Sequence, residues 1–298
     1  MIFKGRGLSK KHFNKKVSYI IDDFLVSGAI TMIYAPPKNG KSSFAMGLCK
    51  WLMDNTDLYP FYLDYDNPTI ALEDRKVNKI IEEYQHRFDY IHPDEVKMTA
   101  KSVIDELLND VKRIDYSKVV LFFDSVKHFV SDISSDGTVN AFMEKMKILR
   151  SAGITIILLH HTNKNEANYK GSGGLLEDSD NVFSLTSESL NIHEGNMLLE
   201  RKVARFGKVK STAFNLRKDN WAMKAIDYKD AQLPHHVREF IKEVRRILTK
   251  EKQLNQTKLL EAMNKDKADR TSLDLLTEYT GRFWAFEEKG KAKLYTLI

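Results

Sequence analysis

The feature that most constrains the fold is an eight-residue loop between an apolar segment and a helical segment. Its sequence at residues 35–42, Ala-Pro-Pro-Lys-Asn-Gly-Lys-Ser, fits the phosphate-loop pattern, except that Ala35 replaces the usual first glycine. Gly40 permits a close backbone turn, Lys41 would bring a positive charge to β- and γ-phosphate oxygens, and the Ser42 hydroxyl suits Mg²⁺. The loop is therefore expected to hold the phosphates of a nucleotide.

Both flanks of this loop agree with that interpretation. Residues 30–34 predict a buried strand, and residues 43–52 predict a helix whose N-terminus faces the anion. A glycine-lysine turn that binds nothing does not need both flanks. The expected nucleotide contacts are Ala35, Pro36, Pro37, Lys38, Asn39, Gly40, Lys41, Ser42 and Ser43.

Composition excludes several classes of protein. The chain has 298 residues, of which 42% are hydrophobic and 30% charged, enough for one large domain and a small one. No apolar run reaches the length of a membrane span, and the N-terminus lacks the apolar segment of a secretory signal. The single cysteine, Cys49, rules out a disulfide framework and a cysteine-based zinc site. We therefore expect a cytoplasmic protein with no membrane partner.

The formal net charge of +6 is unevenly distributed. Residues 1–17 form a basic arm that contains no acidic residue. Such an arm suits nucleic acid or an acidic partner, and a solvated tail without a partner fits the charge equally well.

Residues 18–230 predict one α/β domain, because short apolar strands alternate with helical stretches. The expected strands are 30–34, 60–65, 118–124, 154–160, 181–185, 196–201 and 211–217. The expected helices are 41–53, 69–85, 100–112 and 138–151. This order predicts a mostly parallel sheet with helices on both faces, and the closely spaced later strands predict an antiparallel edge.

Residues 235–298 predict a separate small domain. Apolar residues recur at helical spacing after Pro234, two short helices fit 257–263 and 272–279, and two strands joined by Lys289-Gly290 predict a hairpin. Three helices followed by a two-stranded ribbon indicate a winged helix. Such a module can bind DNA or dock a protein, and both options stay open.

Carboxylates end two of the predicted strands. Asp124 follows an apolar strand and lies 83 residues after Lys41 (124 − 41), where a phosphate-loop protein needs a carboxylate for Mg²⁺. Asp64 and Asp66 end the strand after the loop helix, and one of them could orient the attacking water. An ordinary strand-ending turn is the alternative for this pair.

Two histidines end the strand over residues 154–160. A metal site is not expected at His160 and His161, because neighbouring strand positions point to opposite faces and no third ligand is nearby. One imidazole is instead expected to sense the γ-phosphate. The following loop, residues 165–174, is rich in glycine and carries Lys170, which could follow a phosphodiester backbone.

A basic stretch at residues 200–208 lies between two late strands. It can be a solvated turn, or it can supply an arginine finger to the nucleotide of the next subunit.

These marks, in this order, resemble the RecA-like ATPase superfamily, and most closely the RepA-type replicative helicases of plasmids and phages. The similarity covers roughly residues 17–228. It implies a catalytic carboxylate at Asp66, where that family has glutamate, and a sensor at His161. It also implies two DNA-binding loops near Lys127–Val139 and Asn163–Leu176. The family's basic pair resembles Lys202 and Arg205, with one extra residue between them.

The resemblance and the residues together predict an oligomeric, Mg²⁺-dependent ATPase acting on DNA, namely a replicative helicase of a mobile element. Lys41, Asp66, Asp124, His161 and Arg205 are the expected catalytic residues; Ser42 and Asp124 are the expected metal ligands, and ATP and Mg²⁺ the cofactors. Expected partners are single-stranded DNA, further subunits in a hexameric ring, and a primase or other replication proteins. The alternatives are a non-motor ATP-binding regulator, a recombinase or a helicase loader.

Overall fold

The computed structural model describes residues 16–111, 113–162, 173–290 and 292–298. The chain divides into two compact units, the first ending at Tyr228 and the second covering Lys229–Ile298. Residues 1–15 of the predicted basic arm and residues 163–172 of the predicted second DNA loop, including Lys170, lie outside the described residues. Among the described helices, none has both the length and the apolar character that a membrane span requires.

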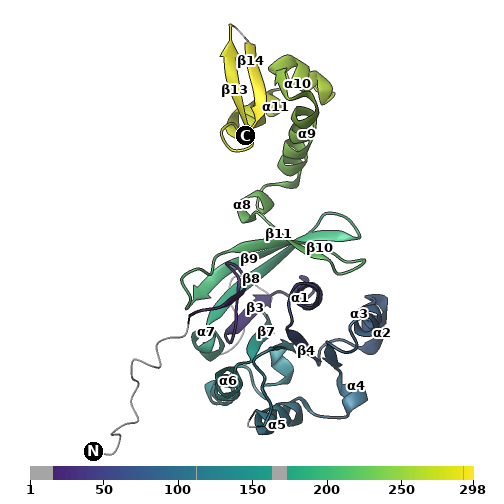
Figure 1. The fold of residues 1–298 in the computed structure, drawn as a ribbon, viewed down its shortest axis with the longest axis vertical. Helices are drawn as coiled ribbons and strands as arrows, with labels where there is room; N and C mark the ends of the chain where they lie inside the picture. The colour runs from purple at the N-terminus through teal and green to yellow at the C-terminus, as the bar shows by residue number, and fades with distance from the viewer. Residues whose placement is uncertain (1–15, 112, 163–172, 291) are drawn as a thin grey trace, which may run out of the picture. The chain divides into compact units, whose positions relative to one another are not determined.

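One large sheet organises the first unit (Figure 1). In the described chain it has nine strands in the order β11-β10-β9-β8-β3-β7-β6-β4-β5. The strands are β3 (Ile30–Ala35), β4 (Tyr59–Asp64), β5 (Asp89–Ile91), β6 (Val119–Asp124), β7 (Thr155–His161), β8 (Asn181–Ser189), β9 (Glu194–Ala204), β10 (Thr212–Arg217) and β11 (Met223–Ile226). β8, β3, β7, β6, β4 and β5 are parallel, whereas β9, β10 and β11 continue the sheet antiparallel. The expected mostly parallel sheet with an antiparallel edge is confirmed.

Helices cover both faces of this sheet. They are α1 (Lys41–Asn55), α2 (Thr69–Asp74), α3 (Val77–Glu83), α4 (Pro93–Val96), α5 (Ala100–Asp110), the short 3-10 turn η2 (Val126–His128), α6 (Asp136–Ser151) and α7 (Gly174–Asp178). One apolar core contains α1, α2, α3 and the small hairpin of β1 (Tyr19–Ile21) and β2 (Leu25–Val26). The other core contains α5, α6 and α7. Apolar side chains alternate along the central strands between these two cores, which is why the strands read as continuous apolar runs.

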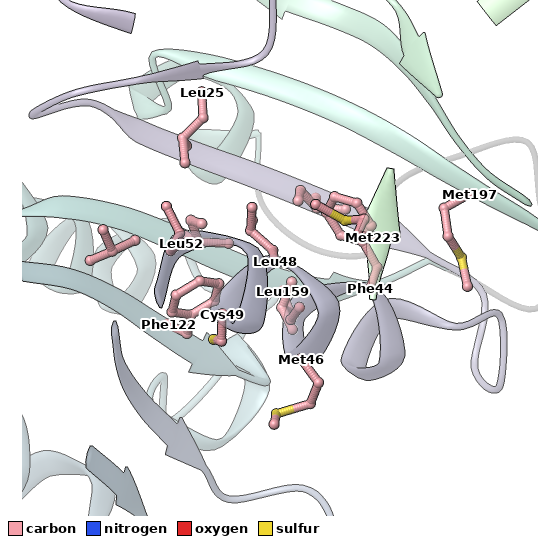
Figure 2. Close-up of a cluster of buried hydrophobic side chains, with 14 of the residues drawn as sticks. Leu25, Phe44, Met46, Leu48, Cys49, Leu52, Phe122, Leu159, Met197 and Met223 are labelled. Carbon is pink, nitrogen blue, oxygen red and sulfur yellow. The ribbon is translucent and has the colours of Figure 1, made fainter. Parts of the chain in front are cut away.

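Packing of α1 fixes the position of the loop that precedes it. Phe44, Leu48 and Leu52 recur at helical spacing and are completely buried. They lie in the same core as Phe122 of β6 and Leu159 of β7 (Figure 2). The N-terminus of α1 is thereby held beside the carboxyl end of β3.

The predicted helix over residues 69–85 is wrong in one respect, because the chain forms two helices there. α2 ends at Asp74 and α3 begins at Val77. Between them Lys76 has φ 59°, in the left-handed region that interrupts a right-handed helix. No glycine or proline marks this break in the sequence.

The second unit has its own core and begins within α8 (Tyr228–Ala231). Its elements are α9 (His235–Glu251), β12 (Gln253–Asn255), α10 (Gln256–Ala262), α11 (Arg270–Glu278), β13 (Trp284–Lys289) and β14 (Ala292–Leu297). β14 lies between β12 and β13 in an antiparallel sheet, and Gly290, with φ 65°, supports the turn of the predicted hairpin. Val244, Leu260 and Trp284 are fully buried in this unit's core.

Candidate active site

The glycine-lysine loop leaves the carboxyl end of β3 and enters α1 at Lys41. Gly40 has φ 77°, and a Cβ atom there would approach the Ser187 side chain to 3.2 Å. Asn39 ties the loop to β8: its Oδ1 accepts hydrogen bonds from the backbone N–H of Ser187 at 3.2 Å and from its hydroxyl at 2.8 Å, and its Nδ2 donates to the Leu185 carbonyl at 3.1 Å. The loop is therefore braced by a neighbouring strand.

Lys41 is buried within this loop. Its ammonium donates hydrogen bonds to the Ala35 carbonyl at 2.9 Å and to the Pro36 carbonyl at 3.0 Å. Burial lowers the pKa of Lys41 to about 8, although the nearby carboxylates of Asp124 and Asp66 act in the opposite direction. Two neutral carbonyls are weak partners for a buried cation, so anionic phosphate oxygens would be better ones.

Asp124 ends β6 and is almost completely buried. The Tyr62 hydroxyl donates to its Oδ2 at 2.7 Å, and Ser42 is a further hydrogen-bond partner. Burial, together with the charge of Asp64, raises the pKa of Asp124 to about 6.

The donor set fits Mg²⁺. This ion prefers oxygen ligands and keeps several of its waters, so one hydroxyl and one carboxylate beside a triphosphate suffice. Ser42 and Asp124 supply that pair. In the part of the chain that the structure describes, no group of three or more His, Cys, Asp or Glu side chains is arranged to hold a metal by itself.

The structure separates the two carboxylates that the sequence left as alternatives. Asp64 is fully buried, and its Oδ1 accepts hydrogen bonds from the backbone N–H groups of Asp66 and Asn67, each at 3.0 Å. The Tyr90 hydroxyl donates to its Oδ2. Asp64 thus holds the turn after β4, whereas Asp66 lines the cavity in front of the loop.

Three side chains converge on Asp66. Lys127 Nζ lies 2.5 Å and His128 Nε2 2.9 Å from Asp66 Oδ1, while His161 Nε2 lies 3.3 Å from Oδ2. The hydrogen bond from His161, followed by those from Lys127 and His128, holds the pKa of Asp66 well below its usual range. His161, the predicted sensor, therefore contacts the predicted catalytic carboxylate, while its neighbour His160 is buried on the other face.

Lys127 and His128 are site residues that the sequence did not predict. Lys127 begins a segment that is expected to contact DNA, and in the structure its ammonium pairs with Asp66. One signal points to them: they lie three and four residues after Asp124, and the carboxyl ends of parallel strands share one edge of the sheet.

A cavity of about 1160 Å³ opens in front of the loop, large enough for a nucleoside triphosphate. Its wall includes Lys38, Asn39, Lys41, Ser42, Asp66, Lys127 and His161, and also Arg75 and Lys218, which the sequence did not predict as site residues. Cations therefore outnumber acids around it, as a phosphate site requires.

Arg205 lies away from this cavity. Its guanidinium is 2.8 Å from Asp180 Oδ1, and Asp180 Oδ2 accepts a hydrogen bond from the backbone N–H of Ile30 at 2.9 Å. Ile30 begins β3 and the phosphate loop follows its other end, so Arg205 is at the opposite edge of the sheet from its own loop. Any contact with a nucleotide would have to be with that of another subunit.

Lys202 is not brought together with Arg205. Its ammonium pairs with Glu200 at 2.7 Å, and Lys202 lines a second cavity of about 560 Å³, which residues 34–39 also line. The two members of the expected basic pair thus have different surroundings.

Comparison with known proteins supports the assignment of the loop. A search of curated proteins found no match. A protein-family model described as an AAA domain matches residues 9–167, more than half of the 298 residues, including the phosphate loop, Asp66, Asp124 and His161. The chain therefore belongs to the AAA domain family of P-loop ATPases.

Proposed function

We propose that the protein is an oligomeric, Mg²⁺-dependent ATPase that acts on DNA. The observation that carries the proposal is the convergence of Lys41, Ser42 and Asp66 on one cavity at the carboxyl edge of the parallel sheet, with Asp124 buried beside Lys41 and Ser42. Catalysis of phosphoryl transfer depends on positioning and on charge stabilisation, and this cavity provides both.

Each residue has a defined task in this proposal. Lys41 leaves the loop carbonyls and binds the β- and γ-phosphate oxygens, which shifts its protonation equilibrium toward the charged form. Asp66 orients the attacking water, and His161 reports the γ-phosphate to the segment that follows β7. Mg²⁺ held by Ser42 and Asp124 would neutralise charge on the transferring phosphoryl group. Arg205 acts on the nucleotide of a neighbouring subunit.

The finer proposal is a replicative helicase of a plasmid or phage, assembled as a hexameric ring on single-stranded DNA. It is supported by the resemblance of the ordered motifs to RepA-type helicases and by the location of Arg205 away from its own nucleotide cavity. A primase or other replication proteins would be its partners.

We propose further that residues 235–298 form a winged helix that binds DNA. Its support is the element order α9-β12-α10-α11-β13-β14 and the sheet order β12-β14-β13. The segment from Leu233 onward carries fourteen basic and ten acidic residues, a net charge of +4 (14 − 10), which favours phosphate contacts.

The test is the rate of ATP hydrolysis with and without single-stranded DNA, measured alongside the mass of the assembly. A motor predicts DNA stimulation, a mass of several subunits and ATP-dependent unwinding of a forked duplex. Hydrolysis that DNA does not change, by a monomer that unwinds nothing, would contradict the helicase proposal and leave only an ATPase.

One observation favours a non-motor regulator as the second candidate. In the single chain Asp66 already has three partners, and Arg205 is paired with Asp180. A protein that changes assembly on ATP binding, and hydrolyses slowly, would suit this arrangement. ATP-dependent DNA binding without unwinding would identify it.

A further inference from the structure

The contact between Lys127 and Asp66 has no part in the catalytic roles proposed so far. Lys127 Nζ lies 2.5 Å from Asp66 Oδ1, at the wall of the cavity that also contains Lys41. Lys127 is close enough to Lys41 for its charge to contribute to the lowered pKa of Lys41. Its ammonium is thus near the place where phosphates would bind.

The surroundings of Lys127 show why it would leave Asp66. The Lys127 side chain is 45% exposed. Its partner atom, Asp66 Oδ1, is also contacted by His128 Nε2 at 2.9 Å. A lysine side chain is flexible and its ammonium has three donors, so it can turn toward a new acceptor at little cost. The terminal phosphate of ATP carries more negative charge than the Asp66 carboxylate, which already contacts three side chains. The phosphate is therefore the stronger partner for the Lys127 ammonium.

Release of Lys127 would also change the hydrogen-bonding capacity of Asp66. While Lys127 and His128 occupy Oδ1 and His161 occupies Oδ2, the carboxylate is a weak hydrogen-bond acceptor for an attacking water. Departure of Lys127 would return an acceptor direction to Asp66 at the moment when the phosphate is in place.

We propose that Lys127 is a ligand of the terminal phosphate of ATP, held by Asp66 until that phosphate arrives, and that its transfer frees Asp66 to orient water. Lys127 then distinguishes a triphosphate from a diphosphate. The inference rests on the proposed ATPase function, because it assigns one more residue to the same cavity.

The experiment measures binding of a non-hydrolysable ATP analogue and of ADP, both with Mg²⁺, to the full-length protein. For Lys127→Met we expect affinity for the analogue to fall about 10- to 100-fold, the effect of losing one charge-assisted hydrogen bond. Affinity for ADP should stay within about twofold of the wild type, since ADP lacks the phosphate concerned. Lys127→Arg should recover most of the difference.

The matched control is Lys118→Met. Lys118 is also a lysine paired with one aspartate, Asp57, but both side chains are largely exposed and neither lines the cavity. Its analogue and ADP affinities should equal those of the wild type.

A second measurement separates phosphate binding from a structural role. Asp66→Ala should tighten binding of the ATP analogue when Lys127 is present, because the substitution releases that lysine. In the Lys127→Met background the same substitution should have an effect smaller by roughly two- to tenfold. Equal effects in both backgrounds would mean that the two residues are not coupled through the nucleotide.

The outcomes distinguish this inference from the function on which it rests. If the wild type binds both nucleotides and Lys127→Met keeps the same ratio of analogue to ADP affinity, the assignment of Lys127 is overturned and the ATPase proposal stands. If the wild type binds neither nucleotide, both are overturned.

Discussion

The two edges of the large sheet differ in how their buried charged side chains are paired. At the carboxyl edge, the pKa of Lys41 is lowered to about 8 and that of Asp124 is raised to about 6, both chiefly through burial. At the other edge Asp180, whose side chain is only 3% exposed, receives Arg150 at 2.9 Å and Arg205 at 2.8 Å as well as a backbone N–H group. Buried ionisable groups that have shifted pKa values and no ion-pair partner of matching charge indicate a ligand-binding site. A buried carboxylate that is paired with arginines indicates a structural role.

The largest expected effect tests the carboxyl edge. Lys41→Ala should reduce ATP hydrolysis by about 10²–10³-fold or more, the cost of removing a preorganised charge at the transferring group. Its thermal unfolding temperature should not fall, because a buried cation bonded only to two carbonyls adds no apolar packing. Unchanged turnover in a well-folded Lys41→Ala variant would show that the nucleotide does not bind at this loop.

Arg205→Ala tests whether one residue of the opposite edge also serves catalysis. As a finger acting in trans it should bind ATP normally and hydrolyse it about 10²-fold or more slowly. Mixing Arg205→Ala with Lys41→Ala subunits should restore part of the activity, because some interfaces then combine an intact loop with an intact arginine.

The control is Arg150→Ala, which removes the other guanidinium from Asp180. It should lower the midpoint of urea unfolding but keep turnover per folded subunit. If both arginine variants lose stability and neither loses turnover, Arg205 belongs to the structural cluster alone.

The lowered pKa of Lys41 predicts opposite effects of pH on affinity and stability. Above about pH 8 the unbound lysine becomes neutral, so ATP affinity should fall, by at most tenfold per pH unit. Between about pH 8 and the ordinary lysine pKa of 10.5 the folded protein holds fewer protons than the unfolded one, so the contribution of Lys41 to stability should rise with pH. Lys41→Ala should lack both dependences; their persistence would place the responsible group elsewhere.

The smallest expected effect concerns the second unit. Removing residues 235–298 should leave a folded ATPase, since the cores of the first unit contain no residue from that segment. If the segment contacts DNA, the truncated protein should show a shallower salt dependence of DNA affinity, by about 0.9 in the log–log slope per lost phosphate contact. Equal slopes and affinities would make it a protein-docking module.

Local signals were enough for much of the fold. Apolar runs such as residues 118–124 and 154–160 became β6 and β7 within one residue, because strands buried on both faces admit few polar side chains. Short elements without such a run were not predicted, and β5 and β12 have only three residues each. The break between α2 and α3 was also not predicted, because Lys76 adopts a positive φ angle at a position where the sequence has no glycine.

The site was less predictable than the fold, because its contacts join distant segments. The sequence proposed Asp66 and His161 separately, but nothing local indicates that Lys127, His128 and His161 would meet on one carboxylate. The same holds for Arg205, whose partner Asp180 precedes another strand. The roles of these residues remain predictions.

The catalytic role of Asp66 is tested most directly by the steady-state rate of ATP hydrolysis by Asp66→Asn, compared with Asp64→Asn and the wild type. Asp66→Asn should stay folded and bind ATP at least as tightly as the wild type, yet hydrolyse it about 10²-fold or more slowly, the loss typical of a missing general base. Asp64→Asn should lower stability, because Asp64 is buried and holds the turn after β4. A wild-type rate in Asp66→Asn, or a loss confined to Asp64→Asn in folded protein, would contradict the assignment of the catalytic carboxylate.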